Sequence, residues 1–212
     1  MLRQSWSDGL VTGDSLGVFP YPSPGFNVTP KPARAKGPPI WIGGGAPAAL
    51  RRAGRIADGY LSSGSGAATF AERVGYVREG EAAAGRESGS VVVAVHRPTF
   101  VWRDGDAWER VRDYAHYMSW KYEDMGPAFG SRERRRPPAL SAEDEAVVRG
   151  RAIVGTPEQV AEKIATYRDA LGPNGHFIAR AYFPGLDPAI QRESQAILGE
   201  EVRALLGASD GT

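Results

Sequence analysis

The 212-residue chain contains no cysteine. This absence excludes a disulfide framework, a thiolate nucleophile and a cysteine-bound metal, and it favours a reducing compartment. Long hydrophobic runs are missing too, since none approaches the ~18 apolar residues of a membrane-spanning helix. Residues 1–10 contain no apolar segment of the kind found in signal peptides. We therefore predict a cytoplasmic protein that does not bind membranes.

The chain also lacks a strong net charge. It has 26 Lys and Arg against 25 Asp and Glu, which gives a formal net charge of +1. This balance provides no field that would attract nucleic acid or an anionic membrane surface. Because 42% of the residues are hydrophobic, the chain can bury a core. We predict one globular unit that binds a small-molecule substrate locally.

The first part of the chain is rich in glycine, proline, serine and aspartate. Its Pro-rich run Phe19–Gly25 can continue neither a helix nor a central strand, so residues 1–38 are predicted to be an extended arm. Residues Leu2–Trp6 are typical of the last turn of a helix, but no Ser, Thr, Asp or Asn precedes them as an N-cap. We therefore expect the chain to begin within a structural element.

Beyond the arm, short apolar runs alternate with helical patterns. The run Ile40–Ile42 is closed by glycines and predicts a buried parallel strand that turns sharply into a helix, with Pro47 at its first position. The other predicted strands cover residues 57–64, 90–95 with a less regular continuation to 101, and 175–183.

Helical patterns fill the intervals between these strands. Thr156 as N-cap, Pro157 at the first position and Gln159 at the third give a capping box. Residues 125–140 are predicted to form a mobile loop, and residues 208–212 a disordered tail. The predicted helices cover residues 47–56, 69–84, 107–123, 156–171 and 188–206.

Alternating strands and helices predict an α/β fold with a parallel sheet and right-handed crossovers. The two common closures are an open doubly wound sheet and an eight-stranded barrel. A complete (β/α)8 barrel takes roughly 250 residues, and four strands cannot close one. The predicted architecture is therefore incomplete as a barrel.

Two stretches resemble the luciferase-like monooxygenases. Residues 38–61, PPIWIGGGAPAALRRAGRIADGYL, are similar to the fifth strand, fifth helix and sixth strand of that family, particularly of members that use deazaflavin. Residues 153–162, IVGTPEQVAE, together with the strand that ends at Phe183–Gly185, resemble the family's last helix–strand passage. The resemblance implies that residues 39–207 form the C-terminal half of a (β/α)8 TIM barrel, with four strand–helix units, and that the first half is absent.

The resemblance also implies a function. Family members bind FMN or a reduced deazaflavin (coenzyme F-420), which carries out hydride transfer or oxygen activation on small organic substrates. The implied activity is that of an oxidoreductase or monooxygenase. Groups that line the cofactor ring come from both halves of such barrels, and the acid–base histidines commonly lie in the first half. We therefore assign no catalytic residue and expect the chain alone to be inactive or nearly so.

Two short turns are the candidate cofactor site. Gly43, Gly44 and Gly45 end a strand and open a helix, where backbone N–H groups and the helix dipole favour a phosphate. Ser62, Ser63 and Gly64 end the neighbouring strand, and their hydroxyls could donate to the same phosphate at the active end of a barrel. The alternative interpretation is that the three glycines only make a tight turn.

Charged groups in the strands have both structural and functional interpretations. The three histidines do not have metal-ligand spacing, so no metal site is predicted. We expect His96 to face the active end of the sheet and His176 the opposite end, each as a structural or solvated residue, as is His116. For Arg97 and Arg180 we favour internal salt bridges, or for Arg97 a position at the rim, over contact with a ligand.

Two questions remain open at the level of sequence. The aromatic residues of the helix at 107–123 are most simply packing residues, with a substrate pocket as the alternative. The half-barrel is either part of a flavin- or deazaflavin-dependent oxidoreductase or a binding and assembly module, which forms a homodimer or pairs with a complementary N-terminal half. A phosphate-ligand-binding α/β protein unrelated to flavins is a third interpretation.

Overall fold

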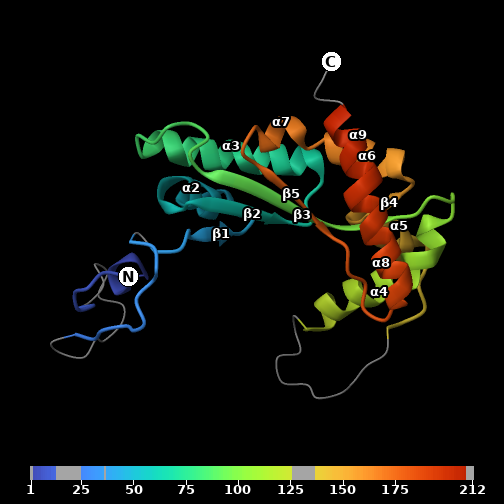
Figure 1. Cartoon of the computed structure of the whole chain (residues 1–212), viewed down its shortest axis with the longest axis horizontal. Coiled ribbons are helices and arrows are strands. Elements are labelled where there is room, and N and C mark those ends of the chain that lie inside the picture. The colour runs from blue at the N-terminus through green and yellow to red at the C-terminus, as the bar shows by residue number, and fades with distance from the viewer. Residues whose placement is uncertain (1, 13–24, 36, 126–136, 209–212) are drawn as a thin grey trace. The chain divides into compact units, whose positions relative to one another are not determined.

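The computed structural model describes residues 2–12, 25–35, 37–125 and 137–208 (Figure 1). It divides into two compact units, Met1–Ile40 and Trp41–Thr212, and each is described by itself. Most of the predicted Pro-rich run, most of the predicted mobile loop and most of the predicted tail lie outside the described residues.

The first unit has little regular structure among its described residues. Helix α1, Leu2–Ser5, is a single turn and lies where the last turn of a helix was predicted. Val11 and Phe26 form an isolated antiparallel bridge, with N···O distances of 2.8 and 3.1 Å. The Lys31 ammonium donates to the Ser5 carbonyl oxygen at 3.1 Å. These bonds tie segments of the unit to one another.

The second unit is a five-stranded sheet in which every pair of strands is parallel, so the predicted fold class is confirmed. The strands are β1 Trp41–Gly43, β2 Gly59–Ser63, β3 Val92–Val101, β4 Ile153–Gly155 and β5 His176–Arg180. The helices are α2 Pro47–Ile56, α3 Ala67–Ala83, α4 Ala107–Met125, α5 Ala142–Arg151, α6 Pro157–Ala165, α7 Arg168–Leu171, α8 Pro188–Ile197 and α9 Arg203–Ala208, with a π-helical segment, η1 Leu198–Val202, between the last two.

Strand β3 holds the sheet together, because β2, β4 and β5 all pair with it. On one flank of β3, β2 ends opposite His96 and β4 begins opposite Thr99. The N–H groups of Val92 and Trp102 donate to residues just before β2 and at the end of β4, so even-numbered positions of β3 face this flank. Pro98, which has no backbone N–H to donate, lies between the stretch of β3 that faces β2 and the stretch that faces β4. The central strand can therefore contain this proline without losing a hydrogen bond of the sheet.

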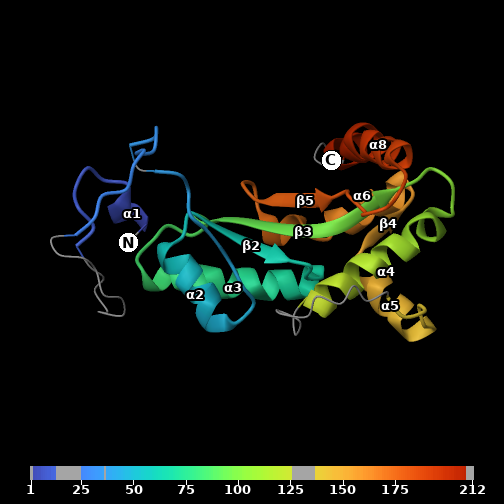
Figure 2. The ribbon, with the colours of Figure 1, turned by 90° about the horizontal axis from the view of Figure 1, so that it is seen from below.

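The helices cover the strands unevenly. In Figures 1 and 2, α2 and α3 lie side by side along β1–β3, whereas α4, α5 and α8 gather at the other end of β3, near β4. The helix-covered face buries the main core, which includes Leu50, Tyr60, Phe70, Val77 and Val95. A second core cluster packs α4 against the far end of β3 through Phe100, Trp108 and Phe183. The carboxyl ends of β2 and β5 thus lie near α4.

The structure corrects several predicted elements. Strand β1 is not buried, because Trp41 is 39% exposed and Gly43 is also exposed. The helix predicted over 156–171 is divided into α6 and α7, although its capping box at Thr156 is present as predicted. Helix α5 and strand β4 were not predicted, because β4 is only three residues long and α5 has few apolar positions.

Glu81 of α3 anchors the turn that leads into β3. Its carboxylate accepts hydrogen bonds from the Val91 N–H at 2.6 Å and the Gly89 N–H at 3.1 Å, and it pairs with Arg78 at 3.0 Å. Burial by itself raises the pKa of Glu81, but the hydrogen bonds and the charge of Arg78 together lower the pKa below its usual value. The charged carboxylate is thus the form that stabilises the fold.

We expect Glu81→Gln to lower the free energy of unfolding by about 1–3 kcal/mol, because buried donors lose a charged acceptor. The folded pKa lies below the unfolded one, so the stabilisation is present above roughly pH 4.5 and is lost as the pH falls through the folded pKa. Urea unfolding between pH 3.5 and 7 measures both effects. Glu79→Gln is the matched control, because among the described residues Glu79 forms only an exposed ion pair with Arg51. Equal losses in both variants would contradict the prediction.

Candidate functional site

The two predicted cofactor turns are neighbours in the structure. Strands β1 and β2 pair in parallel, with Gly43 opposite Leu61, so the glycine turn and the Ser62–Gly64 turn leave the sheet side by side. Because side chains alternate along a strand, Ser62 and Ser63 point to opposite faces of the sheet. Ser62 is fully buried and Ser63 is exposed. The six predicted residues are therefore close in the fold but serve two different faces.

An arginine that the sequence did not single out joins the turns on the helix face. Arg73 of α3 donates to the Ser62 hydroxyl at 3.0 Å, and that hydroxyl lies 2.7 Å from the hydroxyl of Ser65. A Cβ added at Gly45 would lie 3.0 Å from Arg73 Nη2. The guanidinium of Arg73 thus lies over the glycine turn and contacts the second turn as well.

Two of the three glycines of the first turn, Gly44 and Gly45, are constrained by its geometry. Gly44 has a φ of 138°, in the region that L side chains rarely adopt. Its carbonyl accepts from the hydroxyl of buried Tyr60 at 3.0 Å. At Gly45 any side chain would meet Arg73. Exposed backbone, a hydroxyl and a guanidinium therefore meet at the end of the strands, and this donor set fits a phosphate.

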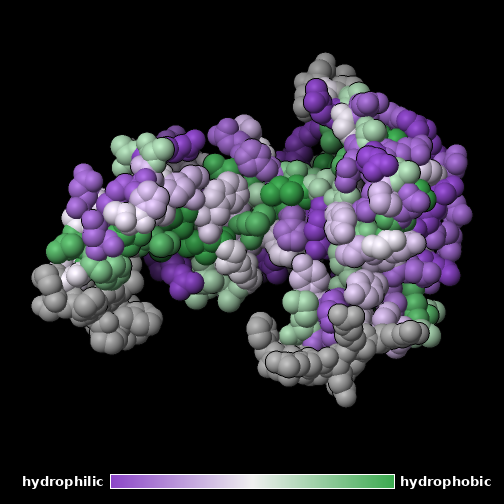
Figure 3. Space-filling view, turned by 60° about the horizontal axis from the view of Figure 1, so that its bottom comes forward, coloured by the Kyte–Doolittle hydropathy of each residue, from purple (hydrophilic) through white to green (hydrophobic). Residues whose placement is uncertain are grey.

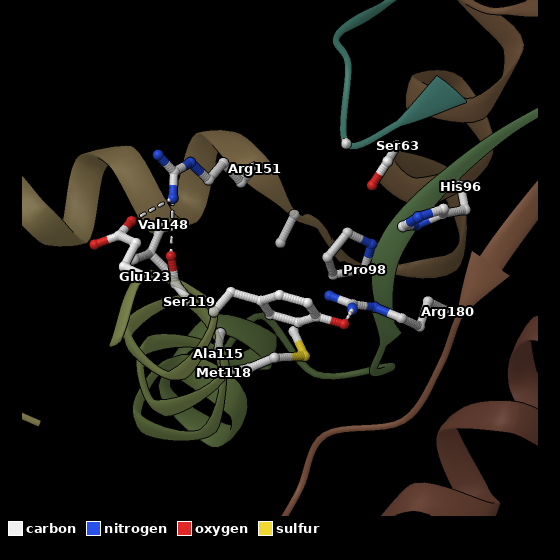
Figure 4. A pocket seen from close by; sticks show the side chains of 13 residues that line it. Ser63, His96, Pro98, Ala115, Met118, Ser119, Glu123, Val148, Arg151 and Arg180 are labelled. Carbon is white, nitrogen blue, oxygen red and sulfur yellow. Dashed lines mark hydrogen bonds and ion pairs between the residues drawn. The ribbon is translucent and has the colours of Figure 1, made fainter. Parts of the chain in front are cut away.

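Ser63 and Gly64 belong to a separate cavity of about 340 Å³ at the carboxyl ends of β2 and β5 (Figure 4). Helices α4 and α5 close its far side. Figure 4 shows Ser63, His96 and Arg180 on one wall of the cavity. On the opposite side, Arg151 donates a hydrogen bond to Glu123. The rest of the lining is largely apolar: Pro98, Ala115, Met118, Val148 and Ala152, with Ser119 and Tyr122.

His96 is part of the cavity wall. Burial lowers its pKa, and the positive charges of Arg180 and Arg97 lower the pKa further. Its Nδ1 is buried and has no hydrogen-bond partner among the described residues. His96 therefore lines the cavity at the carboxyl ends of β2 and β5.

The other two histidines lie away from the cavity. His176 begins β5 and stacks on Trp41, with ring centroids 6.4 Å apart, which confirms its place at the opposite end of the strand. His116 Nε2 lies 3.0 Å from the Pro138 carbonyl oxygen. Among the described residues no group of three His, Asp or Glu is placed to hold a metal ion.

Arg97 is buried without an anionic partner, contrary to the favoured salt bridge. It is 4% exposed and donates to three neutral oxygens: the Tyr167 hydroxyl at 3.0 Å, the Gly150 carbonyl at 2.9 Å and the Gly64 carbonyl at 3.5 Å. Within the described chain no carboxylate pairs with it. Its side chain ties the loop after β2 to the end of α5 instead.

Arg180 also departs from the predicted salt bridge. Its Nη1 lies 3.5 Å from the hydroxyl of Tyr122, at the limit of a hydrogen bond, and its Nε is buried without a partner among the described residues. Tyr122 belongs to the aromatic set of α4, in which Trp108 and Tyr114 pack in or beside the second core cluster, whereas Tyr117 and Trp120 pack against each other. The substrate-pocket alternative for that set therefore applies to Tyr122.

The sequence profile of luciferase-like monooxygenases matches residues 1–173. The chain belongs to this family. No curated protein matches it. The family membership accounts for the parallel strand order and for the position of the cavity, because in a (β/α)8 barrel the active site lies at the carboxyl ends of the strands.

Solved structures of similar fold support the assignment of a partial barrel. Monooxygenase RslO1 from Streptomyces bottropensis has a TM-score of 0.68 and 16% identity, covering 96% of this chain and 58% of its own. The coenzyme F420-dependent tetrahydromethanopterin reductase from Methanopyrus kandleri has a TM-score of 0.52 and 22% identity, with coverages of 79% and 51%. An FMN complex of the oxygenating constituent of 3,6-diketocamphane monooxygenase from Pseudomonas putida has a TM-score of 0.55 and 23% identity, with coverages of 79% and 49%. This family member thus spans about half the length of these structures.

None of the described helices is long and apolar enough to cross a membrane.

Tyr167 links Arg97 to the loop that carries the second turn, since its hydroxyl also donates to the Ser65 carbonyl oxygen at 3.0 Å. We expect Tyr167→Phe to lower the free energy of unfolding by about 1–3 kcal/mol, because a buried guanidinium loses an acceptor and a buried carbonyl loses a donor. Urea denaturation measures the loss. Tyr76→Phe is the control, because among the described residues the Tyr76 hydroxyl bonds only to exposed Glu72. A similarly small loss of unfolding free energy in both variants would argue against a stabilising role for the bonds of Tyr167 to Arg97 and Ser65.

Proposed function

We propose that this chain contributes the cofactor-phosphate site of a flavin- or deazaflavin-dependent oxidoreductase of monooxygenase type acting on a small organic substrate. The observation that carries the proposal is the position of Arg73, which bonds Ser62 and lies over Gly45. A guanidinium, a hydroxyl and exposed glycine backbone are the groups that bind a phosphate ester. The family relationship supplies the cofactor class, because both FMN and coenzyme F420 occur in the names of the similar structures.

The residues that would hold the cofactor act through its phosphate. The glycine turn Gly43–Gly45 would provide backbone N–H groups, Arg73 would balance the charge of the phosphate, and Ser62 would hold the Arg73 guanidinium in place. Ser63 and Gly64 face the cavity instead. A flavin or deazaflavin, when bound, supplies hydride transfer, and a flavin also supplies oxygen activation. The chain's own contribution beyond binding is to orient the substrate in the cavity beside His96, whose pKa is lowered by burial and by the charges of Arg180 and Arg97.

Arg73→Gln is expected to weaken binding of FMN, coenzyme F420 or both by at least about tenfold, because a charged hydrogen bond to phosphate is lost. Fluorescence titration of the purified chain with each cofactor measures the affinity. The control is Arg52→Gln, which removes the same charge from an exposed position on α2.

A second variant, Gly45→Val, places a side chain against the Arg73 guanidinium and should weaken binding as well. Unchanged affinity in both variants, or no saturable binding of either cofactor by the wild-type chain, would overturn the proposed phosphate site. We propose further that turnover by the chain alone is absent or very low, which an assay of the purified protein with either reduced cofactor tests.

A second candidate function is assembly with another half-barrel. The sheet face opposite α2 and α3 is open, with Trp41 39% and Ile178 43% exposed, and a band of hydrophobic residues crosses the middle of the face shown in Figure 3. Among the described strands, β1 pairs only with β2 and β5 only with β3, so both leave an edge unpaired. A second half-barrel would cover this face and pair both edges.

When the purified chain is the only protein in solution, the half-barrel with which it can assemble is a second copy of itself. We therefore expect sedimentation velocity to show a dimer, and Trp41→Glu to shift it toward monomer, because a charge would be buried in an apolar interface. Leu205→Glu is a control at another exposed apolar side chain, 37% exposed in α9. A monodisperse wild-type monomer at micromolar concentration would exclude self-assembly.

A further inference from the structure

The cavity beside β5 has a positive end that no acidic side chain of the described chain neutralises. Arg180 contributes a guanidinium whose described contact is the Tyr122 hydroxyl at 3.5 Å, with the ring centroid 5.8 Å from its Cζ. Its buried Nε has no hydrogen-bond partner among the described residues. A buried donor of this kind costs free energy unless a ligand or ordered water accepts from it.

The acidic residue that lines the cavity is already paired elsewhere. Glu123 accepts from Arg151 at 2.9 Å, and Arg151 also donates to the Ser119 hydroxyl. In Figure 4 this cluster lies across the cavity from Arg180. The charge of Arg151 is therefore balanced, whereas the charge of Arg180 is not.

Arg97 adds to the positive potential of the same region. It is buried and contacts only neutral oxygens among the described residues, and its charge acts on His96 together with that of Arg180. Two arginines near one wall of the cavity make this wall positive, which favours an anionic ligand group. The exposed hydroxyl of Ser63 on the same wall can donate to that group.

The opposite part of the cavity is apolar. Ala115, Met118 and Val148 from α4 and α5, with Pro98 and Ala152, offer a surface for a hydrocarbon body. The volume of about 340 Å³ suits a small molecule. A lining that is largely hydrocarbon with one cationic end matches a molecule with an apolar body and one anionic end.

We propose that Arg180, with Ser63 and His96, binds the carboxylate of an organic substrate whose apolar body lies against Met118 and Val148. This inference rests on the proposed function, in which the cavity receives the substrate, and it names the substrate class. A carboxylate suits a single guanidinium with one or two neutral donors beside it. A phosphate would demand more donors, and the donors that fit a phosphate lie at the Arg73 turn instead.

The test is isothermal titration calorimetry of the full chain with phenylacetate, its neutral isostere phenylacetamide, and inorganic phosphate. Phenylacetate is expected to bind saturably, and phenylacetamide at least about tenfold more weakly, because the amide lacks the charge that Arg180 meets. Arg180→Met should abolish the preference for the acid. Arg180→Lys keeps the positive charge and is a smaller change than Arg180→Met, so it should retain part of the preference for the acid.

Two controls separate this inference from other effects. Arg112→Met removes a positive charge from an exposed ion-paired position of α4 and should leave phenylacetate binding unchanged. Arg73→Gln should also leave it unchanged, while Arg180→Met should leave cofactor affinity unchanged, so a failure of the phosphate site and a failure of the carboxylate subsite are distinguishable. Equal binding of the acid and the amide, unaltered phenylacetate binding by Arg180→Met, or phosphate binding that depends on Arg180 would overturn the proposal.

Discussion

The pairing of three strands with β3 is the constraint on which the rest of the structure depends. The register places β2 opposite residues 92–96 of β3, β5 opposite residues 94–98 and β4 opposite residues 99–101. Alternation along the strand then sends His96 into the cavity and Arg97 toward the helices. A slip of one residue would exchange these two faces and remove both arrangements.

Burying Arg97 without a carboxylate is costly, and the fold offsets that cost with neutral acceptors from three separate segments. The same bonds hold the loop after β2, which carries Ser65 and, through Ser65, the Ser62 hydroxyl that Arg73 contacts. The conformation of the proposed phosphate turn thus depends on Arg97, which belongs to the neighbouring strand β3. The geometry of the turn depends on the core as much as on its own glycines.

Periodicity and turn chemistry predicted most of the second unit, because long strands and well-capped helices carry strong local signals. The capping box at Thr156 and the apolar run of β3 are examples. Strand β4 is too short for periodicity to detect, and the exposure of β1 depends on what covers the sheet rather than on local sequence. The family resemblance indicated both turns, but Arg73 is one of many helix arginines, and only the tertiary structure shows that it contacts Ser62.

Ser62 and Ser63 show how one strand end can serve two kinds of chemistry. Because adjacent side chains point to opposite faces, Ser62 meets Arg73 under the helices while Ser63 opens into the cavity with Arg180. A cofactor phosphate at the first arginine and a substrate carboxylate at the second would then be held from the same short segment, yet on separate faces of the sheet. The strand itself would keep the two anions apart. The two sites could therefore distinguish phosphate from carboxylate by position and would not depend on charge alone.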